Sequence, residues 1–336
     1  LKLNAGEAAF TRISYPPHHW KHLTGALPQL PAADRLGLLD DLLALTRAGH
    51  HTAPTLLDFL AAYAGESDYI VFSAIAAALD AVSRLLPISG DTRDRFNAFA
   101  RSLVQQTARR LGWRERENEP HETRLLRPLA LDASINYGDD ARIKEAVRRF
   151  LAYRDGDADA ISADLRGVMF AAVASAGGVH EWKQLAKRYH DAERAEEKKE
   201  LLLALGNFRV PALIEKTLAF SFSSSVRLQD IRIVFSNVGK NPHAHETSWR
   251  FFTGHFDEFV KRFADNPMLM GKMLESLLGF SASEDAAQEI ETFFGAHPIP
   301  EASRAIEKAL EHIRVRARWK TRDKSAIAEW LSGRKK

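Results

Sequence analysis

Apolar residues recur at helical spacing along nearly the whole chain, and only short polar turns separate one such stretch from the next. Leu39, Leu42 and Leu43 follow the i, i+3, i+4 rule, and a stripe at residues 302–317 repeats it behind Pro300. The same pattern covers about residues 52–63, 69–86, 91–111, 121–136, 139–153, 162–175, 179–190, 194–206, 210–220, 227–238, 246–263, 266–278, 283–294 and 323–332. The sequence therefore predicts an all-α fold of about fifteen helices or more.

So many helices are too many for one bundle around a single centre. Stacked antiparallel helix pairs solve this packing problem, because each pair buries its apolar face against the next pair. The turns are short and polar, as at Gly177-Gly178 and Asn241-Pro242, and none is long enough for a domain linker. We therefore predict an α-α superhelix, a HEAT- or armadillo-like solenoid. It forms one domain over residues 16–333, followed by a basic tail at 334–336.

Residues 1–15 form the one stretch that is typical of extended structure. Phe10, Thr11, Ile13 and Tyr15 are strand-forming residues, and Pro16-Pro17 end the run. A lone strand cannot satisfy its own backbone hydrogen bonds, so it needs a partner strand in a neighbouring segment or outside this chain. We expect a short N-terminal strand. Because the chain opens at Leu1 without a Met, we also expect a fragment of a longer protein.

The chain contains no cysteine, which excludes disulfide frameworks, thiol catalysis and Cys-based zinc sites. This composition fits a reducing compartment, and we expect a cytoplasmic protein. The longest stretches without a charged residue or His are residues 69–79 and 167–179, of 11 and 13 residues. Neither is long enough to cross a bilayer as a helix, so no membrane segment is expected.

The net charge is +3, and residues 314–336 carry nine basic residues against two acidic ones. A basic end can bind an acidic partner or nucleic acid. The same residues also form a helical pattern, and cations near a helix C-terminus suit the macrodipole. We favour a solvated helix and expect no nucleic-acid partner, because the chain as a whole is only weakly basic.

The residue pattern offers no catalytic or metal-binding set. His245-Glu246 begins like a zincin motif, but the second His is missing, and His18 and His22 have no carboxylate beside them. There is no nucleophile elbow and no phosphate-binding glycine loop. We expect no catalytic residue, no metal site and no cofactor in this chain.

One polar cluster stands out at residues 227–230, where Arg227, Gln229 and Asp230 begin an otherwise apolar helix. It can be a plain helix start, with Asp230 near the positive end of the helix dipole. It can also be a set of donors and acceptors that faces a groove. Both interpretations stay open on the residues alone.

Several segments carry a family resemblance through their order and spacing. They are NAGEAAFTRISY (4–15), DRLGLLDDLLALTRAG (34–49), ADLRGVMFAAVASAGGVHEW (163–182), EKKELLLALGN (197–207), VRLQD (226–230), Asn241-Pro242 with Trp249, and ARWKTRDKSAIAEWL (317–331). Together they resemble the C-terminal domain of the gluzincin zinc aminopeptidases, a family that includes puromycin-sensitive aminopeptidase, aminopeptidase N and the endoplasmic-reticulum aminopeptidases. The last segment resembles that family's final helix pair. The sequence departs from the family pattern at Ala9, Thr11 and Ala244.

The resemblance implies a superhelix of HEAT-like helix pairs that covers a thermolysin-like catalytic domain. Residues 1–15 would be the strand and linker from a preceding β domain. The chain would be a non-catalytic lid and cavity wall, with its own N-terminal catalytic domain and peptide substrates as partners. Zinc is expected in that missing domain, and the parent enzyme would remove N-terminal residues from peptides. Arg227, Gln229, Asp230 and Asn241 are the candidate contacts to substrate or to the domain interface.

A free-standing α-solenoid that binds another protein along one face is the alternative. The opening stretch of extended character favours the first interpretation, because a scaffold has no use for a lone strand. A fragment cut from a larger enzyme would carry one.

Overall fold

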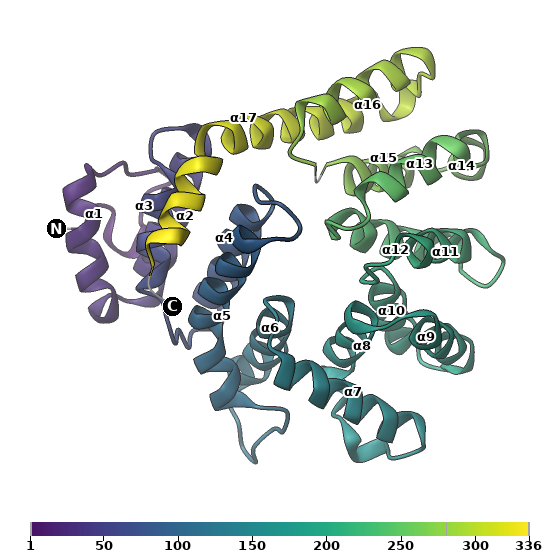
Figure 1. The fold of residues 1–336 in the computed structure, drawn as a ribbon, viewed down its shortest axis with the longest axis horizontal. Coiled ribbons are helices and arrows are strands. Elements are labelled where there is room, and N and C mark those ends of the chain that lie inside the picture. Colours follow the sequence, from purple (N-terminus) through teal and green to yellow (C-terminus); the bar gives the residue numbers. More distant parts are fainter. Residues whose placement is uncertain (1, 280, 335–336) are drawn as a thin grey trace. The chain divides into compact units, whose positions relative to one another are not determined.

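The computed structural model describes residues 2–279 and 281–334, and these residues are almost entirely helical (Figure 1). They form seventeen α-helices and five short 3-10 helices, and no strand occurs among them. The all-α prediction is confirmed. The chain divides into two compact units, Leu1–Arg142 with Arg318–Lys336, and Ile143–Ala317. The domain limits expected at residues 15 and 333 stay a prediction.

The first unit is built around a row of three helices. α4 packs against both α2 and α6, while α3 packs on α2 and α5 packs on α6. Local sequence sets the helix ends: the Asp68 carboxylate accepts hydrogen bonds from the N–H groups of Ile70 and Val71 at the start of α4, at 2.9 and 3.0 Å. The helix bounds are α1 Pro17–Ala26, α2 Ala32–Ala48, α3 Ala53–Ala61, α4 Tyr69–Ser83, α5 Asp91–Leu111 and α6 His121–Asn136.

The second unit has two layers of helices (Figure 1). α10 packs between α8 and α12, and α12 packs on α15, so these four helices form one layer. α9, α11 and α13 form the other layer, as expected for stacked helix pairs. The bounds are α7 Asp140–Arg154, α8 Arg166–Ala176, α9 Val179–Asp191, α10 Ala195–Leu205, α11 Pro211–Phe222, α12 Leu228–Lys240, α13 His245–Gly254, α14 Phe256–Phe263, α15 Pro267–Leu278, α16 Glu284–Ala296 and α17 Ser303–Gly333, of which the residues from Arg318 onward belong to the first unit.

The predicted N-terminal strand does not form in residues 2–15. Ala5–Glu7 form a 3-10 turn instead, and residues 11–15 have no regular structure. The described residues contain no strand with which this segment could pair. Side chains of α2 accept hydrogen bonds from its backbone N–H groups instead. The carboxylates of Asp34 and Asp41 accept hydrogen bonds from the N–H groups of Gly6 and Ile13, at 2.6 and 3.0 Å. The segment therefore lies along α2, and these hydrogen bonds hold it there.

The predicted helix pair at the C-terminal end is a single helix, α17. Residues 317–323 contain no Gly or Pro that would end a helix, which explains the continuity. Its last turns bring Trp319, Ile327 and Leu331 into the core of the first unit. Asp323 is buried there and accepts hydrogen bonds from the Ala53 N–H, at 3.1 Å, and from the Trp319 indole, at 3.0 Å. The C-terminal end of α17 therefore caps α3.

The predicted helix over 246–263 is interrupted. α13 ends at Gly254 and α14 begins at Phe256, with His255 between them at φ −120° and ψ 23°. The ring nitrogen Nδ1 of His255 lies 2.8 Å from the carbonyl oxygen of Phe251. A side chain that engages this carbonyl, next to a glycine, favours a break at this point.

Candidate functional site

The polar cluster singled out from the sequence lies at the start of α12. Arg227 is the residue before the helix, and its Nε donates to Oδ2 of Asp230 at 2.6 Å. The Arg227 side chain is 64% exposed and that of Asp230 is 16% exposed. Among the described residues no hydrogen bond engages the Nη atoms of Arg227. The guanidinium is therefore oriented by one contact and keeps two nitrogen atoms for another group.

Gln229 and Asn241 do not join this pair. Gln229 is exposed on the same first turn of α12. Asn241 is buried at the end of α12, where its Nδ2 donates to the carbonyl oxygens of Gly206 and Phe208 at 3.0 and 2.7 Å. Its Oδ1 accepts from the His243 N–H at 3.0 Å. Asn241 thus ties the turn after α10 to the turn after α12, and its contact with a substrate stays an untested prediction.

A buried polar network that the sequence did not indicate joins α7, α9 and α10. The Tyr153 hydroxyl donates to Oε1 of Glu197 at 3.1 Å, and Nε of Arg188 donates to the same oxygen at 2.6 Å. Arg188 also donates to the Tyr153 hydroxyl at 2.8 Å. The guanidinium carbons of Arg188 and Arg166 lie 4.7 and 5.0 Å from the centre of the Tyr153 ring. The network fixes how these helices pack.

Glu200 lies one turn further along α10, beside α8. A Cβ atom at Gly167 would stand 3.6 Å from the Cγ of Glu200, so the two helices approach closely here. Burial raises the pKa of Glu200 to about 7, although Arg166 opposes the rise and the carboxylate of Glu197 adds to it. The junction of α8 and α10 therefore holds a carboxyl group that titrates near neutral pH.

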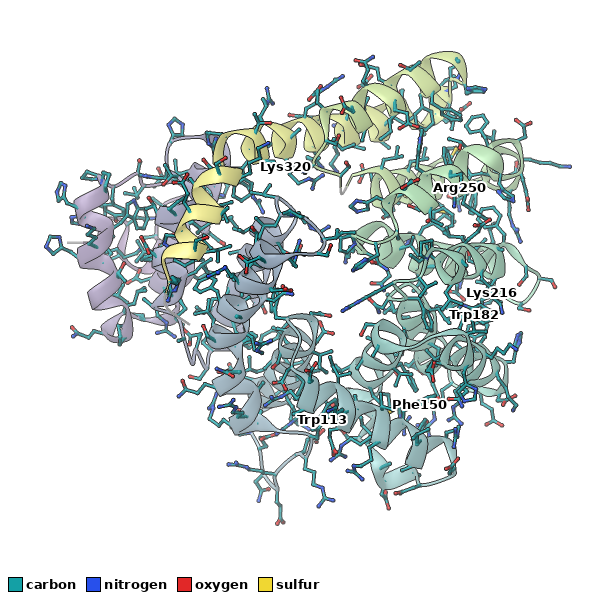
Figure 2. All side chains as sticks on the ribbon, in the orientation of Figure 1. Trp113, Phe150, Trp182, Lys216, Arg250 and Lys320 are labelled. Carbon is teal, nitrogen blue, oxygen red and sulfur yellow. The ribbon has the colours of Figure 1, made fainter. Side chains whose placement is uncertain are left out.

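Cationic side chains also stack on the second layer of this unit. Nζ of Lys216 in α11 lies 4.0 Å from the centre of the Trp182 ring in α9 (Figure 2). The Trp182 indole donates to the Thr217 hydroxyl at 2.8 Å. Trp182 is 6% exposed, so it belongs to the core.

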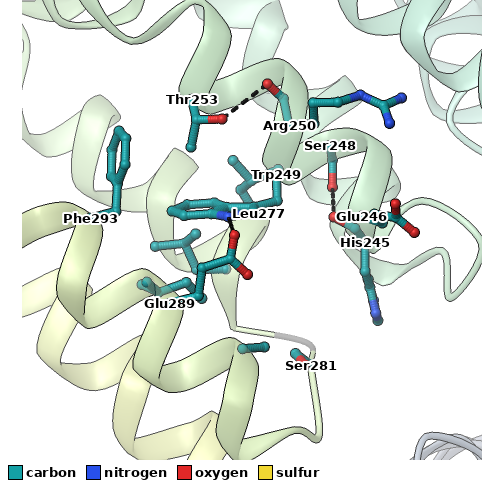
Figure 3. Close-up of a pocket in the computed structure, with 13 residues that line it drawn as sticks. His245, Glu246, Ser248, Trp249, Arg250, Thr253, Leu277, Ser281, Glu289 and Phe293 are labelled. Carbon is teal, nitrogen blue, oxygen red and sulfur yellow. Dashed lines mark hydrogen bonds between the residues drawn. The ribbon is translucent and has the colours of Figure 1, made fainter.

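A pocket of about 590 Å³ lies between α13, the end of α15 and α16 (Figure 3). Its volume falls in the range of small-molecule and peptide side-chain sites. The Trp249 indole projects into it and donates to Oε1 of Glu289 at 2.7 Å. The Trp249 ring stacks on Phe252 with centroids 5.8 Å apart and meets Phe293 edge-on at 5.2 Å. The pocket therefore has an aromatic wall that a hydrogen bond to Glu289 holds in place.

Metal ligands do not converge at any of these places. Among residues 2–279 and 281–334, no group of three or more His, Asp or Glu side chains is placed to hold a metal ion. His245 and Glu246 both line the pocket, whereas His18 and His22 are exposed on α1. In the same described part of the chain, no helix has both the length and the apolar character needed to span a membrane.

The model of one protein family, described as the ERAP1-like C-terminal domain, matches residues 1–315. The match covers nearly the whole chain. This chain belongs to the ERAP1-like C-terminal domain family. Within this family domain, the VRLQD segment (226–230) forms the turn into α12, and Trp249 forms the wall of the pocket.

Relatives of the family domain are aminopeptidases by name. The chain is 25% identical over 332 residues to "Aminopeptidase 2, mitochondrial" of Saccharomyces cerevisiae, covering 98% of this chain and 35% of the relative. It is 29% identical over 325 residues to "Aminopeptidase M1-D" of Oryza sativa subsp. japonica, covering 95% and 37%. It is 27% identical over 333 residues to "Alanine/arginine aminopeptidase" of Saccharomyces cerevisiae, covering 98% and 39%. The chain thus spans just over a third of the length of these relatives.

The pocket of this family domain was not predicted from the sequence. Trp249 and its hydrogen-bond partner Glu289 lie 40 positions apart in the sequence. Only the packing of α13 on α16 brings them together. A Trp with a His-Glu pair before it, on a helix of moderate polarity, was the one available signal.

Proposed function

We propose that this chain is the non-catalytic C-terminal domain of a zinc-dependent aminopeptidase, where it covers the catalytic domain and forms the wall of a peptide-binding cavity. The family match over residues 1–315 carries the proposal. The names of the relatives, and their greater length, support it. A layered stack of helices suits this role, because stacked helix pairs offer a long continuous binding surface.

In this proposal the parent enzyme removes N-terminal residues from peptides. Zinc and the reacting groups belong to the N-terminal catalytic domain, which is also the main partner of this chain. A zinc ion in such a site activates a water molecule and polarises the peptide carbonyl. The protein works in the cytoplasm, as the lack of cysteine suggests.

The pair of Arg227 and Asp230 is the proposed contact with substrate or with the catalytic domain. A guanidinium offers a planar set of donors for a carboxylate or a peptide carbonyl. Asp230 orients this set through the 2.6 Å hydrogen bond, and the exposed amide of Gln229 adds one donor group and one acceptor.

The test compares two substrates of the full-length protein that contains this chain. One is a free nonapeptide, and the other carries the same nine residues as the start of a tightly folded protein. A closed cavity admits the peptide only, so we expect release of the N-terminal residue from the free peptide and little or none from the folded protein. Equal rates on both substrates would contradict the role as a cavity wall. No hydrolysis of either would contradict the aminopeptidase assignment.

A further inference from the structure

The pocket between α13, α15 and α16 combines a cavity with a largely apolar lining. Trp249 and Phe293 provide aromatic surface, and Leu277 and Ile290 provide aliphatic surface (Figure 3). Surface of this kind accepts the methylene stem of a long side chain, whose polar end then stays at the rim. A cavity of about 590 Å³ is large enough for one such side chain and the adjoining backbone.

Carboxylates dominate the polar part of the lining. Oε1 of Glu289 accepts a hydrogen bond from the Trp249 indole. This bond holds the carboxylate at the pocket and leaves Oε2 for a ligand. Glu246 lines the pocket as well, and no hydrogen bond or ion pair engages its carboxylate within residues 2–279 and 281–334. Two acceptor groups with negative charge are therefore available at one cavity.

Ser248, Thr253 and Arg250, which also line the pocket, each have a partner other than these carboxylates. The hydroxyls of Ser248 and Thr253 donate to the carbonyl oxygens of His245 and Arg250, at 3.0 and 3.1 Å. Arg250 lines the pocket too, but its Nη2 lies 3.7 Å from Oε2 of Glu215, a residue outside the lining, and its side chain is 62% exposed. The carboxylates would repel an anionic ligand, whereas a cationic ligand would be attracted to them.

We propose that this pocket binds the basic side chain of a peptide, with arginine preferred over lysine. The methylene stem lies on Trp249 and Phe293, the guanidinium pairs with Glu289, and Glu246 adds negative charge to the same lining. Arginine fits better because its planar fork donates two hydrogen bonds to one carboxylate and stacks on an indole ring. The inference rests on the proposed function in one respect, namely that peptides are the source of the cation. It adds a contact that favours peptides with a basic residue.

The test titrates the 336-residue chain with two capped tripeptides in a calorimeter. One is acetyl-Gly-Arg-Gly-amide, and the other carries citrulline, which has the same shape without the charge. We expect the arginine peptide to bind at least about fivefold more tightly, the order of one partly exposed ion pair. Equal affinity for both peptides, or no binding of the arginine peptide up to about 10 mM, would overturn the proposal.

Matched variants locate the interaction. Glu289→Gln keeps an acceptor for the Trp249 indole and removes only the charge, so it should weaken the arginine peptide about fivefold and leave the citrulline peptide unchanged. Glu246→Gln should act in the same way. Glu193→Gln makes the same charge change at an exposed position outside the pocket and should have no effect. If all three variants behave alike, the pocket is not the site. Because only the chain's own binding is measured, such a failure leaves the aminopeptidase proposal standing.

Discussion

The side chain of Arg227 is both oriented, by Asp230, and exposed to solvent. Its contact with Asp230 is an ion pair between residues three apart, and such pairs at the surface contribute little to stability. Removing Arg227 should therefore leave the fold intact. The substitution removes the guanidinium group at the start of α12. Its effect should therefore be seen in enzyme kinetics rather than in stability.

In the full-length enzyme, Arg227→Ala should raise KM for peptides more than for single aminoacyl substrates, by about fivefold to tenfold. Peptides are long enough to reach this group in the proposed cavity, and single aminoacyl substrates are not. Steady-state kinetics with both substrate classes measures the difference. Arg232→Ala, at an exposed position one turn further along α12, is the matched control and should change neither constant. Equal kinetics for both classes, with a lowered melting temperature, would show a structural role.

Asn241 shows where reading single residues reached its limit. The family resemblance, which includes Asn241-Pro242 with Trp249 eight positions after Asn241, made Asn241 a candidate contact residue. In the structure its side-chain amide donates hydrogen bonds to the carbonyl oxygens of Gly206 and Phe208, more than 30 positions away. No local pattern encodes such a partner, because it depends on how two turns meet. Arg227 and Asp230, only three residues apart on one helix, could be paired from the sequence.

At the level of elements, helices were predictable and their interruptions were less so. The limits of α5 and α6 match the periodic stretches at 91–111 and 121–136, because apolar spacing and Pro or Gly punctuation mark both ends. The expected strand at the N-terminus failed because β propensity has no effect without a partner strand. The break at His255 depends on one ring contact with the Phe251 carbonyl. Periodicity does not report such a contact.

The packing of α10 on α8 makes a prediction about pH. The pKa of Glu200 rises from 4.5 to about 7 through burial, so between these values the folded chain binds more protons than the unfolded chain. Stability contributed by Glu200 is therefore lost as the pH rises through this window. Glu200→Gln stays neutral, and it should stabilise the chain at pH 8 by about 1 kcal/mol more than at pH 4.5, once screening of this partly exposed group is allowed for.

Urea unfolding of the variant and the parent chain at both pH values measures this difference. Glu193→Gln, at an exposed position before the start of α10, is the matched control and should show no dependence on pH. If Glu200→Gln changes stability equally at both pH values, Glu200 ionises normally in the folded chain. The packing of α8 on α10 would then be looser than described.

At the level of the whole molecule, the chain consists of packed helices joined by hydrogen-bonded polar networks. Its sequence contains no recognisable pattern of catalytic residues. The expected family was confirmed by the match over residues 1–315. Order and spacing of short segments carried that information, although identity to the relatives is below 30% in the three comparisons above. The pocket with Trp249 could not be derived in this way, since its walls come from three helices separated in sequence.

The proposal that catalysis lies outside this chain can be tested by measuring zinc content and hydrolysis on two proteins. Zinc content and hydrolysis of aminoacyl chromogenic substrates are determined for the 336-residue chain and for the full-length protein encoded with its upstream sequence. We expect about one zinc per molecule and chelator-sensitive hydrolysis for the full-length protein, and neither for the chain alone. A full-length protein without zinc or activity would contradict the proposal. So would a purified chain that keeps stoichiometric zinc or hydrolyses the substrates by itself.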